Sequence, residues 1–339
     1  MTHRLLFISL VLSSGAYGNN LDPGISGFLD NPWDTFAKDN TPGGFRIVAL
    51  SHIAEGCLAI SSDSPPEATD CVSRIVELAL DPRISPYVDP AKEELGHHGL
   101  YLSHLNITLG AYQAVSKDNR YQELNARISN HLAAGSLAEP TATFPSFPGE
   151  PARWPADQAA TLHSLHLYDS NFGQDIAKAP IAAWQSYLAK SGIDKKTGLH
   201  VSELTSSKPH SGPPRGCALA WTVRYSVGFD RPWATALWER FVGLYAVEMN
   251  GLSGLREWPP GKDGPADIDS GPILFGIGTA ASAFGLTASR LVGDVETAQK
   301  LSSSRQLALL VAKDDPKLSA ANSGVLGQAI TFHADQIGP

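Results

Sequence analysis

The sequence contains few cysteines and lacks the common local metal motifs. Its 339 residues include only Cys57, Cys71 and Cys217. Neither a CxxC nor an HExxH pattern occurs, so a standard zinc site is not supported. No Gly-rich phosphate loop follows a predicted strand, which argues against a bound nucleotide. We therefore expect no metal and no cofactor.

Long runs of one charge and long apolar runs are also missing. The formal net charge is −8, which argues against nucleic acid or an anionic membrane surface as a partner. No internal stretch reaches the roughly 18 uninterrupted apolar residues that indicate a membrane-spanning helix. The 42% apolar and 18% charged residues are typical of a globular chain with a large core.

The N-terminus is typical of an export signal. Arg4 precedes an apolar stretch at residues 5–12, and small residues follow up to Gly18. This order predicts a signal peptide over residues 1–18 and a periplasmic or secreted mature chain. A disordered tail or a short membrane anchor is the alternative. In an oxidising compartment, Cys57 and Cys71 are candidates to pair across the first helical hairpin, which leaves Cys217 as a small buried residue.

Six short loops rich in Gly, Pro or charged residues each precede an apolar, helix-like run. They lie near Gly44, His98, Pro155, Arg215, Gly271 and Ser323, at intervals of 54, 57, 60, 56 and 52 residues. Each interval has room for two helices and two connections. The pattern predicts an all-α, (α/α)6 toroid over residues 19–339 as one domain. Its inner helices would begin on one face, where long loops surround a central cavity.

The two ends of this predicted ring are less regular. Residues 19–42 are expected to be a loop-like lead-in. The last inner helix, over residues 323–332, has too little sequence after it for an outer partner. We therefore expect the N-terminal segment to complete the ring.

The third loop places a carboxylate at the start of an inner helix. Pro155 suits the first helical position because its missing N–H is not needed there. Asp157 then lies in the first turn, where the helix dipole favours a negative charge. It either complements that dipole or projects into the cavity mouth beside Trp154. A helix N-terminus lowers the pKa of a carboxyl, which suits Asp157 to the role of base or nucleophile.

The fifth loop repeats this design with two acids. Pro272 is expected to begin the helix, with Ser270 or Gly271 as its cap. Asp267 and Asp269 would lie on one side if the backbone is extended. Helix capping needs one carboxylate at most, so we hypothesise a catalytic or substrate-binding role for Asp269.

Other loops at the same face add candidates for substrate binding. Trp258 follows Arg256 and Glu257, and a Trp beside ionisable groups suits stacking on a sugar, although a salt-bridged loop explains the pattern as well. Arg215 is suited to hold an anion or to orient a carboxylate. The remaining candidates are Trp221 and Tyr225 in the fourth unit and His98, Tyr101 and His104 in the second.

Several segments resemble one known family. They are residues 101–106 (YLSHLN), 110–113 (GAYQ), 164–169 (SLHLYD) and 280–294. These segments are similar to the linalool dehydratase-isomerase family, and weak similarity extends over residues 45–295. The resemblance implies the (α/α)6 fold and places His104 on the family's active-site histidine. Asp157 stands where that family has a catalytic cysteine, so a cysteine-dependent mechanism does not carry over.

Three functions are compatible with this pattern. The first is a metal-independent glycoside hydrolase with Asp157 and Asp269 as its carboxylate pair, Glu257 as a substitute, and tryptophans as sugar platforms. Asp269 or Glu257 would then be the acid, with a pKa raised by its neighbours. The alternative is a dehydratase or isomerase that acts on a small alkenol with the same acids and His104. A non-catalytic binding protein is the third, because a fold does not imply a function.

Overall fold

The computed structural model describes residues 21–39, 41, 43–205, 208–249, 251–312 and 324–338. The predicted export signal and its cleavage site near Gly18 lie outside these residues. No helix in the described ranges is both long enough and apolar enough to cross a membrane.

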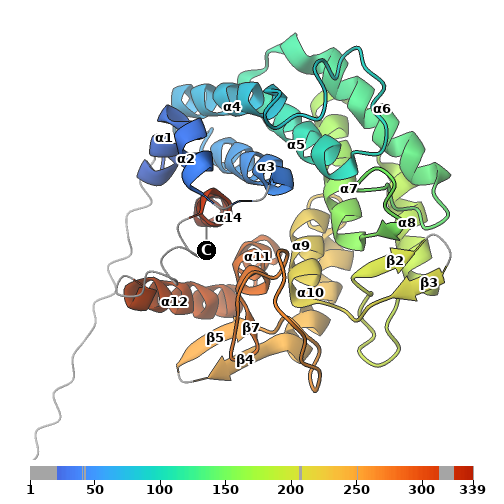
Figure 1. The fold of residues 1–339 in the computed structure, drawn as a ribbon, viewed down its shortest axis with the longest axis vertical. Coiled ribbons are helices and arrows are strands. Elements are labelled where there is room, and N and C mark those ends of the chain that lie inside the picture. The colour runs from blue at the N-terminus through green and yellow to red at the C-terminus, as the bar shows by residue number, and fades with distance from the viewer. Residues whose placement is uncertain are drawn as a thin grey trace, which may run out of the picture.

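Six helices of the described residues form an inner ring. They are α3 (Gly43–Ala59), α5 (Gly99–Ser116), α7 (Pro155–Phe172), α9 (Gly216–Ser226), α11 (Thr279–Val292) and α14 (Val325–Gln336). Each packs against the next, and α14 returns to α3 (Figure 1). The inner position requires burial on every side: α5 is buried continuously from Gly99 to Tyr112. The predicted all-α toroid is confirmed.

A second layer of helices covers the outside of this ring. They are α4 (Pro65–Leu80), α6 (Gln122–Ala138), α8 (Lys178–Ser191), α10 (Arg231–Tyr245) and α12 (Val295–Ala312), with a 3-10 turn, η1 (Asn119–Tyr121), before α6. Their inward faces carry large anchors, since Trp184 and Trp238 are almost completely buried.

The N-terminal segment occupies the sixth outer position, as expected. It is helical rather than loop-like, because α1 (Pro23–Asp30) and α2 (Pro32–Lys38) precede the ring. Asp22 caps α1 by accepting hydrogen bonds from the backbone N–H groups of Gly24 and Ile25. Ile25 and Phe28 are buried, and α1 packs on α14 and α4. This burial stabilises a helix that is too short to persist alone.

Short strands occur in the long loops that precede α7, α9 and α11. Strands β1 (Ala152–Arg153), β2 (Glu203–Thr205) and β3 (Lys208–Ser211) form one antiparallel sheet, in which Ala152 lies opposite Thr205. Strands β4 (Ala246–Met249) and β5 (Leu252–Leu255) form a hairpin, and so do β6 (Ile273–Leu274) and β7 (Ile277–Gly278). The predicted loop face of the toroid therefore carries small sheets.

The last hairpin corrects the predicted start of the fifth inner helix. Helix α11 begins at Thr279, not at Pro272, and its N-cap is Gly278 rather than Ser270 or Gly271. Phe275 and Gly276 both have positive φ, 53° and 82°, as two-residue hairpin turns require. The six residues after Pro272 thus form a hairpin, two paired strands and a two-residue turn, before the helix begins.

A disulfide joins the first inner and outer helices. Cys57 of α3 is bonded to Cys71 of α4, and both residues are fully buried. The sequence left this pairing open, and the structure shows it across the first helical hairpin. Cys217 is free and buried.

Candidate functional site

A cavity of about 850 Å³ lies at the face where the inner helices begin. Six predicted site residues line it: Trp154, Asp157, Arg215, Trp221, Trp258 and Asp269. Much of the remaining wall is apolar and includes Phe45, Leu100, Phe147, Leu274, Phe284 and Ile330. The loops preceding three inner helices therefore bring carboxylates, an arginine and tryptophans together around one space.

Asp157 is held by the proline-rich excursion at residues 139–151. The Ser146 hydroxyl donates a 2.5 Å hydrogen bond to Oδ2 of Asp157. The excursion is itself anchored, because the backbone N–H of Gly99 donates to the Pro145 carbonyl at 3.0 Å. The start of α5 thus fixes a loop that orients a carboxylate of α7. Ser146 was not among the predicted site residues, and the prolines around it, at 140, 145, 148 and 151, were the available signal of an irregular loop.

The environment of Asp157 favours the neutral acid. Burial raises the pKa of Asp157 to about 6. The Ser146 hydrogen bond acts to lower this pKa, and the charge of Asp269 acts to raise it further. The prediction that the helix N-terminus lowers this pKa is wrong, because desolvation outweighs the dipole. The direction of this shift is the one that a general acid requires.

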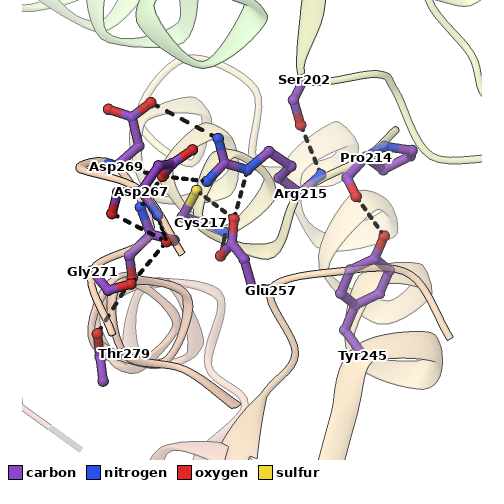
Figure 2. A network of polar contacts seen from close by, with 11 residues as sticks. Ser202, Pro214, Arg215, Cys217, Tyr245, Glu257, Asp267, Asp269, Gly271 and Thr279 are labelled. Carbon is purple, nitrogen blue, oxygen red and sulfur yellow. Dashed lines mark hydrogen bonds and ion pairs between the residues drawn. The ribbon is translucent and has the colours of Figure 1, made fainter. Parts of the chain in front are cut away.

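Arg215 lies at the centre of a network at the start of α9 (Figure 2). Its Nε donates to Oε1 of Glu257 at 2.8 Å, and its Nη2 donates to Oδ1 of Asp267 at 2.7 Å. Its Nη1 lies 3.9 Å from Oδ2 of Asp269. The guanidinium also lies 5.1 Å from the centre of the Trp258 ring. Arg215 thus contacts three carboxylates of one connection, residues 256–272 between β5 and β6.

The two acids of the fifth loop face Arg215 from a turn and not from an extended strand. Oδ1 of Asp267 accepts hydrogen bonds from the N–H groups of Asp269 and Ser270, at 3.1 and 2.9 Å. Burial acts to raise the pKa of Asp267, but the hydrogen bonds from Arg215 and Ser270 outweigh it and lower the pKa. Partial desolvation and the charge of Asp267 raise the pKa of Asp269.

Glu257 lies behind Arg215, and its predicted role as the substitute acid stays a prediction. Its side chain has no exposed surface and does not line the cavity. Besides the Arg215 bond, Oε1 accepts from the Cys217 thiol and Oε2 from the Cys217 N–H, both at 3.1 Å. Burial raises the pKa of Glu257 against these hydrogen bonds. Its carboxylate therefore fixes Arg215 through the hydrogen bond from Nε.

Cys217 is a cavity residue that the sequence analysis treated as packing. It lines the cavity one helical turn before Trp221 in α9. Burial and the charge of Glu257 raise the pKa of the Cys217 thiol well above its usual range. The group therefore stays a neutral thiol at physiological pH. The sequence signal that could have identified Cys217 as a cavity residue is its position directly after Arg215 and Gly216, at the start of an inner helix.

Five other predicted residues lie away from the cavity wall: His98, Tyr101, His104, Tyr225 and Arg256. His104 is fully buried, and its Nδ1 lies 2.7 Å from the Ser51 hydroxyl. Burial and the charge of Arg224 lower the pKa of His104 to about 3, so its imidazole is neutral. Its ring centre lies 5.5 Å from that of Trp221. An active-site role for His104 stays a prediction from the resemblance.

The other four make structural contacts. The Tyr101 hydroxyl donates to the Ala79 carbonyl at 2.9 Å, and His98 packs edge-on against Tyr87. Arg256 pairs its backbone with β7, and the Tyr225 side chain is fully buried. The described residues hold no group of three or more His, Cys, Asp or Glu side chains that is suited to a metal ion.

Gly216 permits the close packing that holds this network. A Cβ at this position would lie 1.9 Å from the Arg256 carbonyl oxygen and 3.0 Å from Cβ of Ala281. We expect Gly216→Ala to push the loop that carries Glu257 away from Arg215. Unfolding free energy should fall by about 1–3 kcal/mol, and any turnover should fall by roughly 10²-fold through misplacement.

Denaturant unfolding and rate measurements check this expectation. Gly27→Ala is the matched control, because nothing lies within 4 Å of a Cβ added there. Unchanged stability and turnover in Gly216→Ala would show that the loop yields without consequence.

The fold is shared with carbohydrate-active enzymes of known structure. A polysaccharide lyase superposes with a TM-score of 0.56 at 12% identity, over 92% of this chain and 95% of its own. A family 76 glycoside hydrolase from a bovine Bacteroides thetaiotaomicron strain gives 0.54 at 9% identity, over 86% and 68%. A family 105 glycoside hydrolase from C. acetobutylicum gives 0.52 at 12% identity, over 91% and 98%. No protein-family profile matches the chain. At these identities the likeness shows the fold alone.

Proposed function

We propose that the protein is a carbohydrate-active hydrolase in which Asp157 and Asp269 form the acid and carboxylate pair. One observation carries this proposal. Two carboxyl groups in different environments line one cavity, at the face where the inner helices begin. The pKa of Asp157 is raised to about 6 by burial, whereas Asp269 is half exposed beside Arg215. Unequal environments of this kind separate acid and base roles in carboxylate pairs.

The chemistry follows from these roles. Protonated Asp157 would donate its proton to the glycosidic oxygen as the C–O bond breaks. Ionised Asp269 would either activate a water molecule or attack the anomeric carbon, and water completes the hydrolysis. Arg215 would hold Asp269 in place, and Glu257 would hold Arg215. In the first route Asp269 takes the proton of the attacking water, and that proton returns to Asp157 through solvent. In the second route ionised Asp157 takes the proton of the water that hydrolyses the covalent intermediate.

Two further features support a sugar as the substrate. Trp154, Trp221 and Trp258 all line the cavity, and flat aromatic faces suit sugar rings. The structural neighbours include two glycoside hydrolases and a polysaccharide lyase on the same fold. The proposed export agrees with the disulfide between Cys57 and Cys71, because such bonds persist in oxidising compartments.

The second candidate function is dehydration or isomerisation of a small alkenol, and the cavity wall favours it. Phe45, Leu100, Phe284 and Ile330 add apolar surface that a sugar does not require. Asp157 would then protonate the hydroxyl group, which leaves as water, and a carboxylate would remove a proton from carbon.

A substrate panel separates these functions. We would incubate the purified protein with bacterial and plant polysaccharides and with tertiary alkenols, and read the products by mass spectrometry. The variants are Asp157→Asn and Asp269→Asn, with Asp263→Asn as the control, since Asp263 is an exposed acid on the same loop outside the cavity wall.

We expect sugar release by the wild type and by Asp263→Asn, and its loss in the other two variants. Loss of water from an alkenol would instead support the second candidate. Folded protein that is inactive on both classes would contradict the proposal and favour a binding protein.

A further inference from the structure

A second cavity, of about 550 Å³, lies at the opposite end of the ring. It shares no lining residue with the mouth cavity. Residues near the ends of the inner helices line it, among them Glu55 of α3, Arg224 of α9, Leu291 of α11 and His333 of α14. Residues 227–232, which are the loop between α9 and α10 and the first two residues of α10, also line it. The proposed reaction at the mouth assigns no role to this space.

An ion pair forms the floor of this cavity. The side chains of Arg224 and Glu55 are only 1% and 9% exposed, and Nη2 of Arg224 donates to Oε2 of Glu55. The same Nη2 lies 2.9 Å from Nδ1 of His333. The other oxygen of Glu55 lies 2.9 Å from Nε2 of His163. Both carboxylate oxygens of Glu55 are therefore occupied.

The charges of the floor follow from these contacts. Burial acts to raise the pKa of Glu55, but Arg224 and the His163 hydrogen bond hold it well below its usual range. Burial and the charge of Arg224 lower the pKa of His333 to about 3. At neutral pH the floor thus holds one carboxylate, one guanidinium and a neutral imidazole of His333.

A hydrogen-bond donor of this floor remains unused. Among the described residues, Nε of Arg224 is buried without a hydrogen-bond partner, and the contacts described for its guanidinium nitrogens all involve Nη2. Nη1 of Arg231 donates a hydrogen bond to the Leu291 carbonyl at 2.6 Å, and the residue is exposed. The second acid of the wall, Asp230, already accepts from the Trp233 N–H at 3.1 Å. A matching ligand must supply acceptor oxygens, because arginine only donates.

The walls add an apolar requirement. Val227, Phe229, Pro232 and Leu291 surround the polar floor. A bare inorganic anion would leave this apolar surface uncovered, whereas a short apolar body with an anionic head would cover both parts.

We propose that this cavity binds a small organic carboxylate. The carboxylate lies against Arg224 and Arg231, and the apolar body lies against Phe229 and Leu291. This site is separate from the mouth and does not depend on the reaction proposed there.

Isothermal titration with benzoate, and with phosphate as a second probe, tests the proposal on the full chain. Gly228→Leu fills the cavity without changing a charge, since Gly228 lines it and the atoms nearest to an added Cβ belong to His163, from 3.2 Å, and His166, from 3.6 Å. Gly243→Leu is the matched control, because a Cβ at Gly243 meets nothing within 4 Å. We expect saturable benzoate binding by the wild type and by Gly243→Leu. Binding by Gly228→Leu should be at least about tenfold weaker.

Several results would overturn this site. They are the absence of benzoate binding to the wild type, unchanged binding by Gly228→Leu, or binding of phosphate in preference to benzoate. If Gly228→Leu does not fold, Arg231→Ala is used instead, and unweakened benzoate binding in that variant overturns the site. Asp157→Asn must bind benzoate as the wild type does, because a changed affinity in that variant would place the ligand at the mouth.

Discussion

Asp157→Asn is expected to lower the rate by about 10²- to 10⁴-fold, the contribution of a positioned general acid. The amide keeps the shape and the hydrogen bond to the Ser146 hydroxyl, but it has no proton to donate. The remaining rate would come from binding and from Asp269. Steady-state kinetics on the substrate found by the panel would measure this loss.

The pH profile gives the same group a second signature. A general acid works only while protonated, and the pKa of Asp157 is raised to about 6. Activity of the wild type should therefore fall as the pH rises through about 6, and Asp157→Asn should lack this limb. A profile that rises through pH 6 would assign the residue the role of base.

Folding stability should respond in the direction that linkage requires. The unfolded-state pKa of an aspartate is about 3.9, and the folded-state pKa of Asp157 is raised to about 6. The protonated carboxyl therefore stabilises the fold fully below about pH 3.9, and this stability is lost as the pH rises through about 6. Asp157→Asn removes the ionisation. We expect this variant to be more stable than the wild type at pH 8 by about 1–2 kcal/mol, a figure reduced because the Asp157 side chain is partly exposed to water. At pH 4 the variant should not be more stable than the wild type. Denaturant unfolding at the two pH values measures the difference.

Arg224→Met is expected to lower the free energy of unfolding by about 3–5 kcal/mol, because it leaves the charge of Glu55 buried and unpaired. Arg224 is also the only partner described for Oε2 of Glu55. Urea unfolding followed by circular dichroism would show the loss. The double variant Glu55→Leu with Arg224→Met removes both charges and should recover much of it.

An exposed ion pair provides the control. Arg74 pairs with Asp30 and Asp70 at 3.3 and 3.5 Å, and its side chain is 37% exposed. Arg74→Met should cost no more than about 1 kcal/mol, because water screens the pair. Equal losses in Arg74→Met and Arg224→Met would contradict the view that burial sets the strength of the core pair.

The local pattern of the sequence predicted much of the fold. The interval of 52–60 residues identified the inner helices, and the start at Pro155 was placed to the residue because proline suits the first helical position. The predicted start of the fifth inner helix was wrong because residues 273–278 pair with each other as a short hairpin, and their local sequence pattern does not reveal this pairing. Residues 19–42 appeared loop-like because their helices depend on packing against α14 and α4.

Within the candidate site, the sequence by itself determined which side chains the helix starts and the loops before them carry: Asp157, Arg215 and Asp269 all line the cavity. Only the tertiary structure decided their chemistry. Dipole position predicted a lowered pKa for Asp157, but desolvation depends on atoms brought from distant loops, and it reversed the sign. The floor of the second cavity was hidden for the same reason. Glu55 and Arg224 stand 169 residues apart, and only closure of the ring brings their charges together.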